Sequence, residues 1–211
     1  HRRVADVQRC VRLNDLENVG KKARYHTFFE MLGNWSFGDY HKRETLRWGW
    51  EFSTEIVGLD PNRIWGTIYP TDDEAFDIWT KDLGVPAERI IRLEDNFWET
   101  GAPTGPCGPD SEMYFDMGPE FGCGSPECRP GCDCDRYIEY WNHVFTELYK
   151  NEDGSFSPLK EKNIDTGLGL ERLTVIAQKA PSVYETDLFR PIMARVADLV
   201  QNATGRAPDF S

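Results

Sequence analysis

The sequence lacks any long apolar run, and this absence excludes a class of function. No segment of the 211 residues approaches the roughly 20 consecutive apolar residues that a membrane-spanning helix needs. The first residues, His1–Asp6, do not form the apolar core of a signal peptide. We therefore expect a soluble, cytoplasmic protein that makes no contact with a membrane.

The sequence also has few basic residues. Lysine and arginine number 24 against 36 aspartates and glutamates, so the formal net charge at pH 7 is −12. A domain that holds nucleic acid mainly by neutralising phosphates is typically basic, and the acidic balance argues against such a domain. It is compatible with an enzyme that contacts only the end of an RNA, or whose main RNA-binding surface lies elsewhere in the polypeptide.

The hydrophobic pattern predicts one domain of mixed strands and helices. With 39% hydrophobic and 13% aromatic residues, residues 1–211 have enough apolar material for one sizeable domain. A capping box at Thr71–Glu74 begins one helix, and residues 100–135 are mostly loop. The expected strands cover residues 4–12, 24–32, 63–69, 112–116, 137–149 and 162–166. The remaining expected helices cover residues 39–56, 168–179 and 187–200. This order indicates an α+β fold built on an antiparallel sheet.

Two segments carry residues that packing alone does not require. Arg12 ends the first expected strand and faces a loop, a position suited to forked recognition of a phosphate or carboxylate; the alternative is an ordinary surface arginine. Residues 163–172 form a strand, a turn with two glycines and a helix start. Such a turn allows close backbone approach to a ligand, and the helix start favours anions.

Longer motifs carry a family resemblance. The first of these are Cys10–Arg12, Asn14–Gly20 and His26–Tyr40, which together match the second characteristic motif of one enzyme family. Further matches follow in the family's order at Asp95–Trp98, Gly105–Pro109, Trp141–Phe145 and the third motif through Arg172. From Gln8 to Phe189 the chain thus resembles the alanine-specific class II aminoacyl-tRNA synthetases. The resemblance implies a class II antiparallel sheet flanked by helices, activation of alanine by ATP to alanyl-adenylate, and transfer to the 3′ end of tRNA-Ala.

The resemblance also implies an ATP site. Arg12 would bridge the α-phosphate and the alanine carboxylate, Arg24 and Arg172 would hold the outer phosphates, and Arg172 would also cover the adenine. Arg12 and Arg172 would be the catalytic residues, because they stabilise charge at phosphorus. Phe29 is the choice for the opposite face of the adenine, although residues 28 and 29 alternate on a strand and the sequence leaves open which of them stacks. The remaining predicted ATP contacts are His26, Met31 and Gly169.

For alanine, the resemblance places Asp165 on the ammonium group. Trp98, Val144 and Gly167 would shape a small pocket, with Asn142 nearby. Such a pocket discriminates poorly against glycine or serine, so the family needs an editing site, which this chain does not encode.

Magnesium is expected to bridge the ATP phosphates with few protein ligands. Glu139 is a candidate ligand, and the alternative is a charged residue on the solvent face of a strand.

Four of the six cysteines are crowded together. Cys123, Cys128, Cys132 and Cys134 could close a tetrahedral zinc site that ties down a glycine-rich insertion. The alternative is free thiols in a flexible loop. Histidines are not assigned as general bases: His143 should point away from the pocket, because it lies between two pocket residues on a strand.

The chain departs from the family pattern at its start. The first class II motif is missing, and the glycine-rich stretch that usually lies between Arg12 and Asn14 is reduced to Leu13. We expect the elements that recognise tRNA-Ala to lie mostly outside this chain. Two rival interpretations remain: a paralogous adenylating enzyme that loads a non-tRNA acceptor, and an inactive fragment that serves as a binding module.

Overall fold

The computed structural model describes residues 1–14, 16–22 and 24–210. Its centre is an eight-stranded sheet in the order β1-β2-β8-β7-β6-β3-β4, with β5 paired to β6. All strand pairs are antiparallel except β3 with β4. The strands are β1 (Arg3–Val11), β2 (Phe28–Phe37), β3 (Ile64–Ile68), β4 (Ile90–Arg92), β5 (Phe97–Glu99), β6 (Gly105–Asp116), β7 (Tyr137–Lys150) and β8 (Phe156–Gly169). The expected α+β class with an antiparallel sheet is confirmed.

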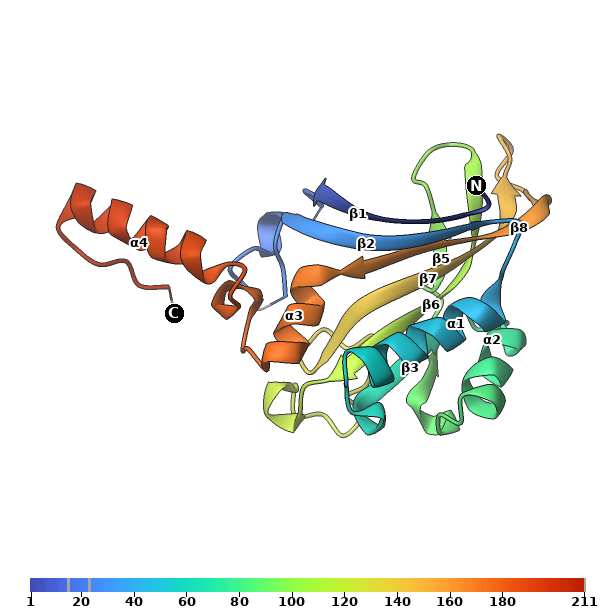
Figure 1. The fold of residues 1–211 in the computed structure, drawn as a ribbon, viewed down its shortest axis with the longest axis horizontal. Helices are drawn as coiled ribbons and strands as arrows, with labels where there is room; N and C mark the ends of the chain where they lie inside the picture. Colours follow the sequence, from blue (N-terminus) through green and yellow to red (C-terminus); the bar gives the residue numbers. More distant parts are fainter. Residues whose placement is uncertain (15, 23, 211) are drawn as a thin grey trace.

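Helices cover one face of this sheet and one of its ends (Figure 1). The α-helices are α1 (Lys42–Glu51), α2 (Asp73–Asp77), α3 (Leu170–Gln178) and α4 (Arg190–Thr204), and π-helical turns extend α1 over Phe52–Ile56 and α2 over Ile78–Asp82. Short 3-10 helices occur at Leu16–Asn18, Pro61–Arg63, Ala87–Arg89, Pro119–Phe121 and Val183–Glu185. Helix α3 contacts β2 and β7, whereas α4 projects beyond the sheet and has no buried residue. None of these helices has the length and apolarity to cross a membrane.

The core lies between the sheet and α1 and α2. Trp79, in the turn after α2, is fully buried, and its indole Nε1 donates to the hydroxyl of Ser111 on β6 at 2.9 Å. A Cβ at Gly66 would lie 3.0 Å from the Trp79 ring, so the glycine makes room for it. The hydrophobic core that contains Trp79 also includes Leu46, Ile64, Ile68, Ile78, Met113, Phe145 and Ile164.

Replacing Trp79 by alanine is expected to lower the free energy of unfolding by about 3–5 kcal/mol, because it removes a fully buried ring and leaves the Ser111 hydroxyl without its partner. The matched control is Trp48→Ala, whose ring is 40% exposed. Trp48→Ala should lower the free energy of unfolding by less than half as much as Trp79→Ala. Urea denaturation of the three proteins measures both changes, and equal losses would contradict the packing described here.

The structure corrects the loop expected over residues 100–135. Residues 105–111 of this stretch extend the expected 112–116 strand into the twelve-residue β6. The Gly-Pro-Cys-Gly-Pro run was wrongly assigned because glycine and proline usually mark loops. Here a register shift between Cys107 and Asp110 accommodates Pro109, while Pro106 pairs with Tyr149. A Cβ at Gly108 would lie 2.0 Å from the carbonyl oxygen of Phe145, so only glycine fits.

Several boundaries also differ from the expectation, among them that of the last helix, which runs over Arg190–Thr204 where 187–200 was expected. The second strand begins at Phe28 and runs to Phe37, whereas it was expected over 24–32. The last strand begins at Phe156, because residues 156–158 pair with the far end of β7. The cap of α2 is the carboxylate of Asp72, which accepts the Ala75 amide at 3.0 Å, in place of the capping box that starts at Thr71. Asp15, within the second-motif segment, lies outside the described residues.

Candidate active site

A cavity of about 430 Å³ opens on the face of the sheet opposite α1. It collects all of the residues predicted for ATP and alanine, together with Glu139. The predicted residues that line it are Arg12, Arg24, His26, Phe29, Met31, Trp98, Glu139, Asn142, Val144, Asp165, Gly167, Gly169 and Arg172. The sequence predictions came from motifs spread over 161 positions, and the fold brings them to one place.

The register of three neighbouring strands builds the floor of this cavity. Met31 on β2 lies opposite Gly169 on β8, Asn142 on β7 lies opposite Gly167, and Val144 lies opposite Asp165. Residues two apart on a strand point to the same face. Positions 142 and 144 on β7, and 165, 167 and 169 on β8, therefore all face the cavity.

The intervening residues face the other way. His143 is fully buried, and its Nδ1 lies 3.1 Å from the Thr45 hydroxyl on α1. Burial lowers the pKa of His143 to about 3. Its side chain points away from the pocket residues on either side of it, as the strand alternation predicts.

The two glycines of β8 differ in what they make room for. A Cβ at Gly167 would lie 3.0 Å from the sulfur of Met31, so a side chain there would displace Met31. At Gly169 the nearest atom would be 3.7 Å away, on Arg172, which is an ordinary contact. Gly167 is thus required by the packing of the cavity floor, whereas a side chain at Gly169 would fill space that the cavity leaves open.

One end of the cavity offers two oxygen acceptors. Asp165 is half-buried, and burial raises the pKa of its carboxyl group. The Asn142 amide donates from Nδ2 to Glu112 at 3.4 Å, while its buried Oδ1 makes no hydrogen bond within the described part of the chain. A carboxylate and an unpaired amide oxygen in one apolar-walled pocket suit a small organic cation.

Three guanidinium groups reach the other end. The Arg172 Nη1 donates to the Glu139 carboxylate at 2.8 Å and to the Glu139 carbonyl at 3.0 Å. The Arg24 Nη1 donates to the Cys134 carbonyl and to the Asp135 carboxylate, both at 2.8 Å. Arg12 is exposed. Because fork-shaped guanidinium groups match the oxygens of phosphates, this end suits a polyphosphate.

Aromatic rings lie beside these arginines. Phe29 faces the cavity, and the Arg12 guanidinium lies 5.6 Å from the centre of its ring, whereas Phe28 on the opposite face is 51% exposed. Burial lowers the pKa of His26, which favours the neutral ring. Its Nδ1 lies 3.1 Å from the Arg24 carbonyl and must donate, because a carbonyl oxygen only accepts.

The remaining lining residues were missed by the sequence reasoning: Tyr25, Glu112, Tyr140 and Thr166. Glu112 is the most informative of them. Its carboxyl group accepts from the Tyr114 hydroxyl at 2.9 Å, the Thr67 hydroxyl at 3.2 Å and the Asn142 amide. Burial, with the nearby Glu139, raises its pKa. The strand over 112–116 was predicted, and an acidic residue in a strand between buried neighbours was the available signal.

Asp110, close to this site on β6, gives the protein a pH-dependent stability. Burial raises its pKa to about 7, and the Asn96 amide donates to it at 2.7 Å. The folded protein therefore keeps a proton that the unfolded chain releases above about pH 4. Relative to an Asp110→Asn variant, native stability should fall as the pH rises to about 7, by at most about 1.4 kcal/mol per pH unit, and then level off. Urea denaturation of both proteins across this range checks the sign, and a constant difference would contradict it.

The four clustered cysteines lie between β6 and β7, and their geometry is that of a metal centre. Their sulfurs all lie within 4.8 Å of one another, with 3.5 Å between Cys123 and Cys132 and between Cys128 and Cys134. Four thiolates about 2.3 Å from a central ion would be separated by about 3.8 Å. The cluster could therefore hold a metal ion. Cys107 is buried separately, in β6.

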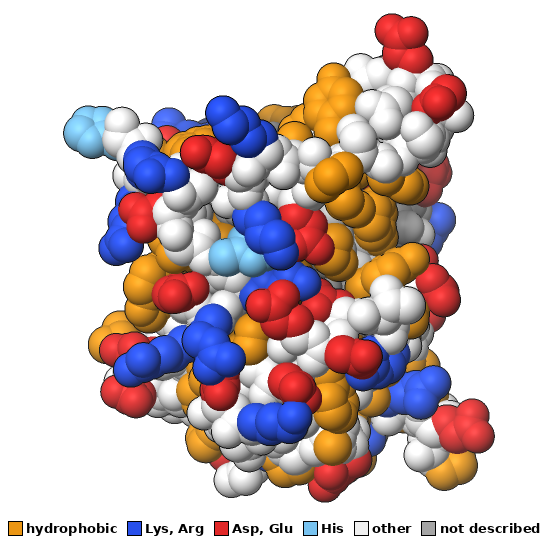
Figure 2. Space-filling model, turned by 90° about the vertical axis from the view of Figure 1, so that its right-hand side faces the viewer, with side chains coloured by type: hydrophobic (Ala, Val, Ile, Leu, Met, Phe, Trp, Pro, Cys, Tyr) orange, Lys and Arg blue, Asp and Glu red, His pale blue; other side chains and the backbone are white. Residues whose placement is uncertain are grey.

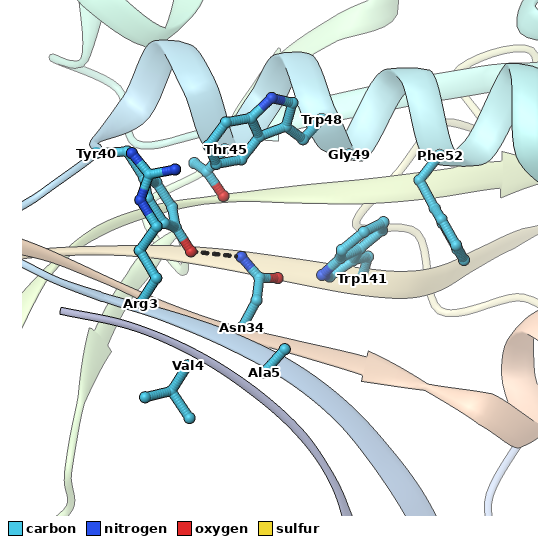
Figure 3. Close-up of a pocket in the computed structure, with 10 residues that line it drawn as sticks. All are labelled: Arg3, Val4, Ala5, Asn34, Tyr40, Thr45, Trp48, Gly49, Phe52 and Trp141. Atoms are coloured by element: carbon cyan, nitrogen blue, oxygen red, sulfur yellow. Dashed lines mark hydrogen bonds between the residues drawn. The ribbon is translucent and has the colours of Figure 1, made fainter. Parts of the chain in front are cut away.

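A second hollow of about 470 Å³ lies between β1, β2 and α1. Figure 3 shows Arg3, Tyr40 and Trp48 at one end and Phe52 and Trp141 at the other, with the Asn34 amide donating to the Tyr40 hydroxyl at 2.9 Å. It contains none of the predicted site residues and no carboxylate. Its chemistry is that of an apolar surface groove, so the smaller cavity on the other face is the candidate active site.

Comparisons with known proteins identify relatives of the chain as a whole. The alanine–tRNA ligase of Natranaerobius thermophilus is 58% identical over 199 residues, which cover 93% of this chain and 22% of that protein. The alanine–tRNA ligase of Clostridioides difficile is 52% identical over 208 residues, which cover 98% of this chain and 23% of that protein. The chain thus spans less than a quarter of the length of these two relatives.

Among solved structures, that of apo histidyl-tRNA synthetase from S. aureus aligns with a TM-score of 0.49 and 13% identity, over 96% of this chain and 55% of that one. The family described as tRNA synthetases class II (A) matches residues 1–209. The chain belongs to the family of class II (A) tRNA synthetases.

Proposed function

We propose that residues 1–211 form a single adenylation core that activates alanine with ATP and passes it to the 3′ end of tRNA-Ala. The observation that carries this proposal is the shared cavity of about 430 Å³, with guanidinium groups at one end and Asp165 with Asn142 at the other. Alanyl-adenylate joins a phosphate and an ammonium group, and the two ends match these charges. The similarity to alanine–tRNA ligases supports the choice of amino acid.

For ATP, Arg12, Arg24 and Arg172 are proposed to hold the phosphates, and Phe29 the adenine ring. His26, Met31 and Gly169 complete this part of the cavity. The alanine carboxylate attacks the α-phosphate, the bond to the β-phosphate breaks and pyrophosphate leaves, so the substrate itself supplies the nucleophile. The protein then contributes positioning and stabilisation of the charge that develops at phosphorus, which fixed guanidinium groups provide.

For alanine, Asp165 and the unpaired Oδ1 of Asn142 are proposed to accept hydrogen bonds from the ammonium group. Trp98, Val144 and Gly167 form the walls. A pocket of this kind excludes larger side chains by contact, yet it discriminates weakly against glycine or serine, because a missing methyl or an added hydroxyl changes binding by only about 1–3 kcal/mol.

Magnesium fits the carboxylate groups of this cavity. Glu139 and Glu112 both line it, and carboxylate oxygens are hard ligands of the kind that this ion prefers. When bound, magnesium would neutralise phosphate charge. Glu139 also receives the Arg172 guanidinium, so its proposed role includes orienting that arginine.

For the cysteine cluster we propose zinc, because four thiolates in tetrahedral reach are typical of this ion and of no hard cation. Such thiols persist in a reducing compartment, which supports the cytoplasm as the place of action.

Figure 2 shows acidic and basic side chains interspersed on one face of the molecule, with no continuous basic patch there. That face therefore offers no extended site for the phosphate groups of a nucleic acid.

The test is exchange of radioactive pyrophosphate into ATP in the presence of alanine, glycine, serine or valine. Exchange should be strongest with alanine, weaker with glycine and serine, and absent with valine. A folded chain that supports no exchange with any of them would overturn the proposal. Transfer of labelled alanine to added tRNA-Ala then identifies the acceptor, and activation without transfer would favour the paralogous adenylating enzyme.

A further inference from the structure

The cysteine cluster lies on a segment that contacts the ATP end of the cavity. We name residues 123–135 the cysteine loop. Arg24, whose side chain is only 14% exposed, donates to the Cys134 carbonyl and to the Asp135 carboxylate of this loop, both at 2.8 Å. Lys22 forms an ion pair with Asp133. The segment that precedes β2 and carries the cavity arginine is thus tied to the loop by charge-assisted hydrogen bonds.

The base of the cysteine loop is anchored to the sheet. Arg136, the residue before β7, donates from two nitrogens to the two carboxylate oxygens of Asp116 at the end of β6, at 2.8 and 2.7 Å. This contact closes the neck of the connection between the two strands. The position of the loop relative to the sheet is therefore defined at its base, and the contacts to Arg24 lie just outside that neck.

The body of the cysteine loop has few packing contacts: Pro130 is its one buried residue, and Gly131 lies against Leu93. Residues 123–127 are exposed, and the loop contains neither a helix nor a strand. Ordering a segment costs conformational entropy, and burial of so little apolar surface does not offset that cost. The four thiols are the groups placed to order it, and a metal ion bound by all of them would link positions 123, 128, 132 and 134.

We propose that a metal ion of the zinc type, bound by Cys123, Cys128, Cys132 and Cys134, orders the cysteine loop so that Cys134 and Asp135 hold Arg24 in the ATP cavity. ATP affinity then depends on the metal although no ligand of the metal touches ATP. The inference rests on the proposed function of the cavity as an ATP site. It extends that function by a structural metal that controls one phosphate-binding arginine.

The expected effect is selective. Loss of the metal frees one long side chain and the short segment around it, a cost that corresponds to roughly tenfold weaker ATP binding. Alanine binding should change little, because Asp165 and Asn142 lie on β8 and β7 and do not contact the cysteine loop.

The experiment uses the whole chain loaded with zinc, loaded with Co²⁺, or stripped by a chelator. Cobalt absorption reports a tetrahedral thiolate site without any activity measurement, and zinc is quantified per chain. ATP and alanine binding are measured by calorimetry. The variants are Asp135→Ala, which removes the carboxylate that accepts from Arg24 but keeps the Cys134 carbonyl contact and the thiols, and Cys134→Ser, which removes one thiol. Cys10→Ser is the matched cysteine control outside the cluster.

We expect one zinc per chain, a tetrahedral tetrathiolate cobalt spectrum, and ATP binding about tenfold weaker in the stripped protein. Asp135→Ala should keep the metal and show part of this weakening, because the Cys134 carbonyl still accepts from Arg24, whereas Cys10→Ser should match the native protein. Absence of the cobalt spectrum would overturn the metal site. Unchanged ATP affinity in the stripped protein and in Asp135→Ala would overturn the coupling. If the zinc-loaded native protein does not bind ATP, the proposed function fails and the coupling with it, while the cobalt spectrum still decides the metal site.

Discussion

Replacing Asp165 by alanine is expected to lower kcat/KM for alanine in pyrophosphate exchange by roughly 100- to 4,000-fold, because removing one partner of a buried ion pair costs about 3–5 kcal/mol. Asp165 faces the cavity from β8, opposite the buried Val144 on β7. Under the proposed function, the variant leaves the Asn142 amide oxygen as the remaining proposed acceptor for the ammonium group of alanine. Exchange kinetics with varied alanine measure the effect.

Asp165→Asn is the matched control for shape. It keeps an oxygen acceptor and the volume of the side chain but removes the charge, so it should lose nearly as much activity as the alanine variant. ATP binding, measured separately by calorimetry, should stay within about twofold of the native value in both variants. If alanine kinetics were unchanged, or if ATP binding fell in parallel, Asp165 would have no specific role toward the amino acid.

The pKa of Asp165 adds a pH dependence of known sign. Burial raises the pKa of its carboxyl group above the usual value, so the group takes up a proton sooner as the pH falls. A protonated carboxyl group loses its attraction for the ammonium group of alanine. The KM for alanine should therefore rise on acidification, and this rise should disappear in Asp165→Asn.

Replacing Arg172 by alanine is expected to reduce kcat/KM for ATP by about 100- to 1,000-fold, in the range seen when a single donor to a developing charge is removed. Its Nη1 donates twice to Glu139, which orients the guanidinium toward the cavity. The variant leaves the Glu139 carboxylate without its guanidinium partner and, under the proposed function, also removes a ligand of the ATP phosphates. Exchange kinetics with varied ATP at saturating alanine measure this loss.

Two further variants separate a role toward ATP from a structural role. Arg172→Lys keeps the positive charge but lacks the paired donors of the planar guanidinium group, so it should recover only part of the activity. Arg9→Ala removes an exposed arginine of β1, whose side chain is 81% exposed, and should be close to native. If Arg172→Ala lowered the melting temperature but left ATP kinetics intact, the residue would serve only the packing of α3.

The strand and helix order could be predicted because most elements have a clear period. The alternation over residues 137–149 predicted β7 to within one residue, and the helix after Gly169 follows from its apolar spacing. The failures occurred where local composition opposes the tertiary structure. Residues 105–109 read as a loop, yet pairing with β5 and β7 places them in β6.

The candidate site could be predicted as a set of residues but not as an arrangement. The motifs identified the arginines, Asp165 and Asn142, whereas Glu112 was missed because it matches no motif used. That Phe29 and not Phe28 faces the cavity follows from the pairing of β2 with β8, since a shift of one residue would exchange the two rings.

By itself the sequence determined which chemical groups are available: the motif residues, the acidic charge and the spacing of Cys123, Cys128, Cys132 and Cys134. Only the tertiary structure decided which of these groups meet. Arg24 and Asp135 are 111 positions apart and lie 2.8 Å from each other. Local patterns determine the period and type of each element, but contacts at such separation depend on strand register and on the closure of long connections, which no local pattern encodes.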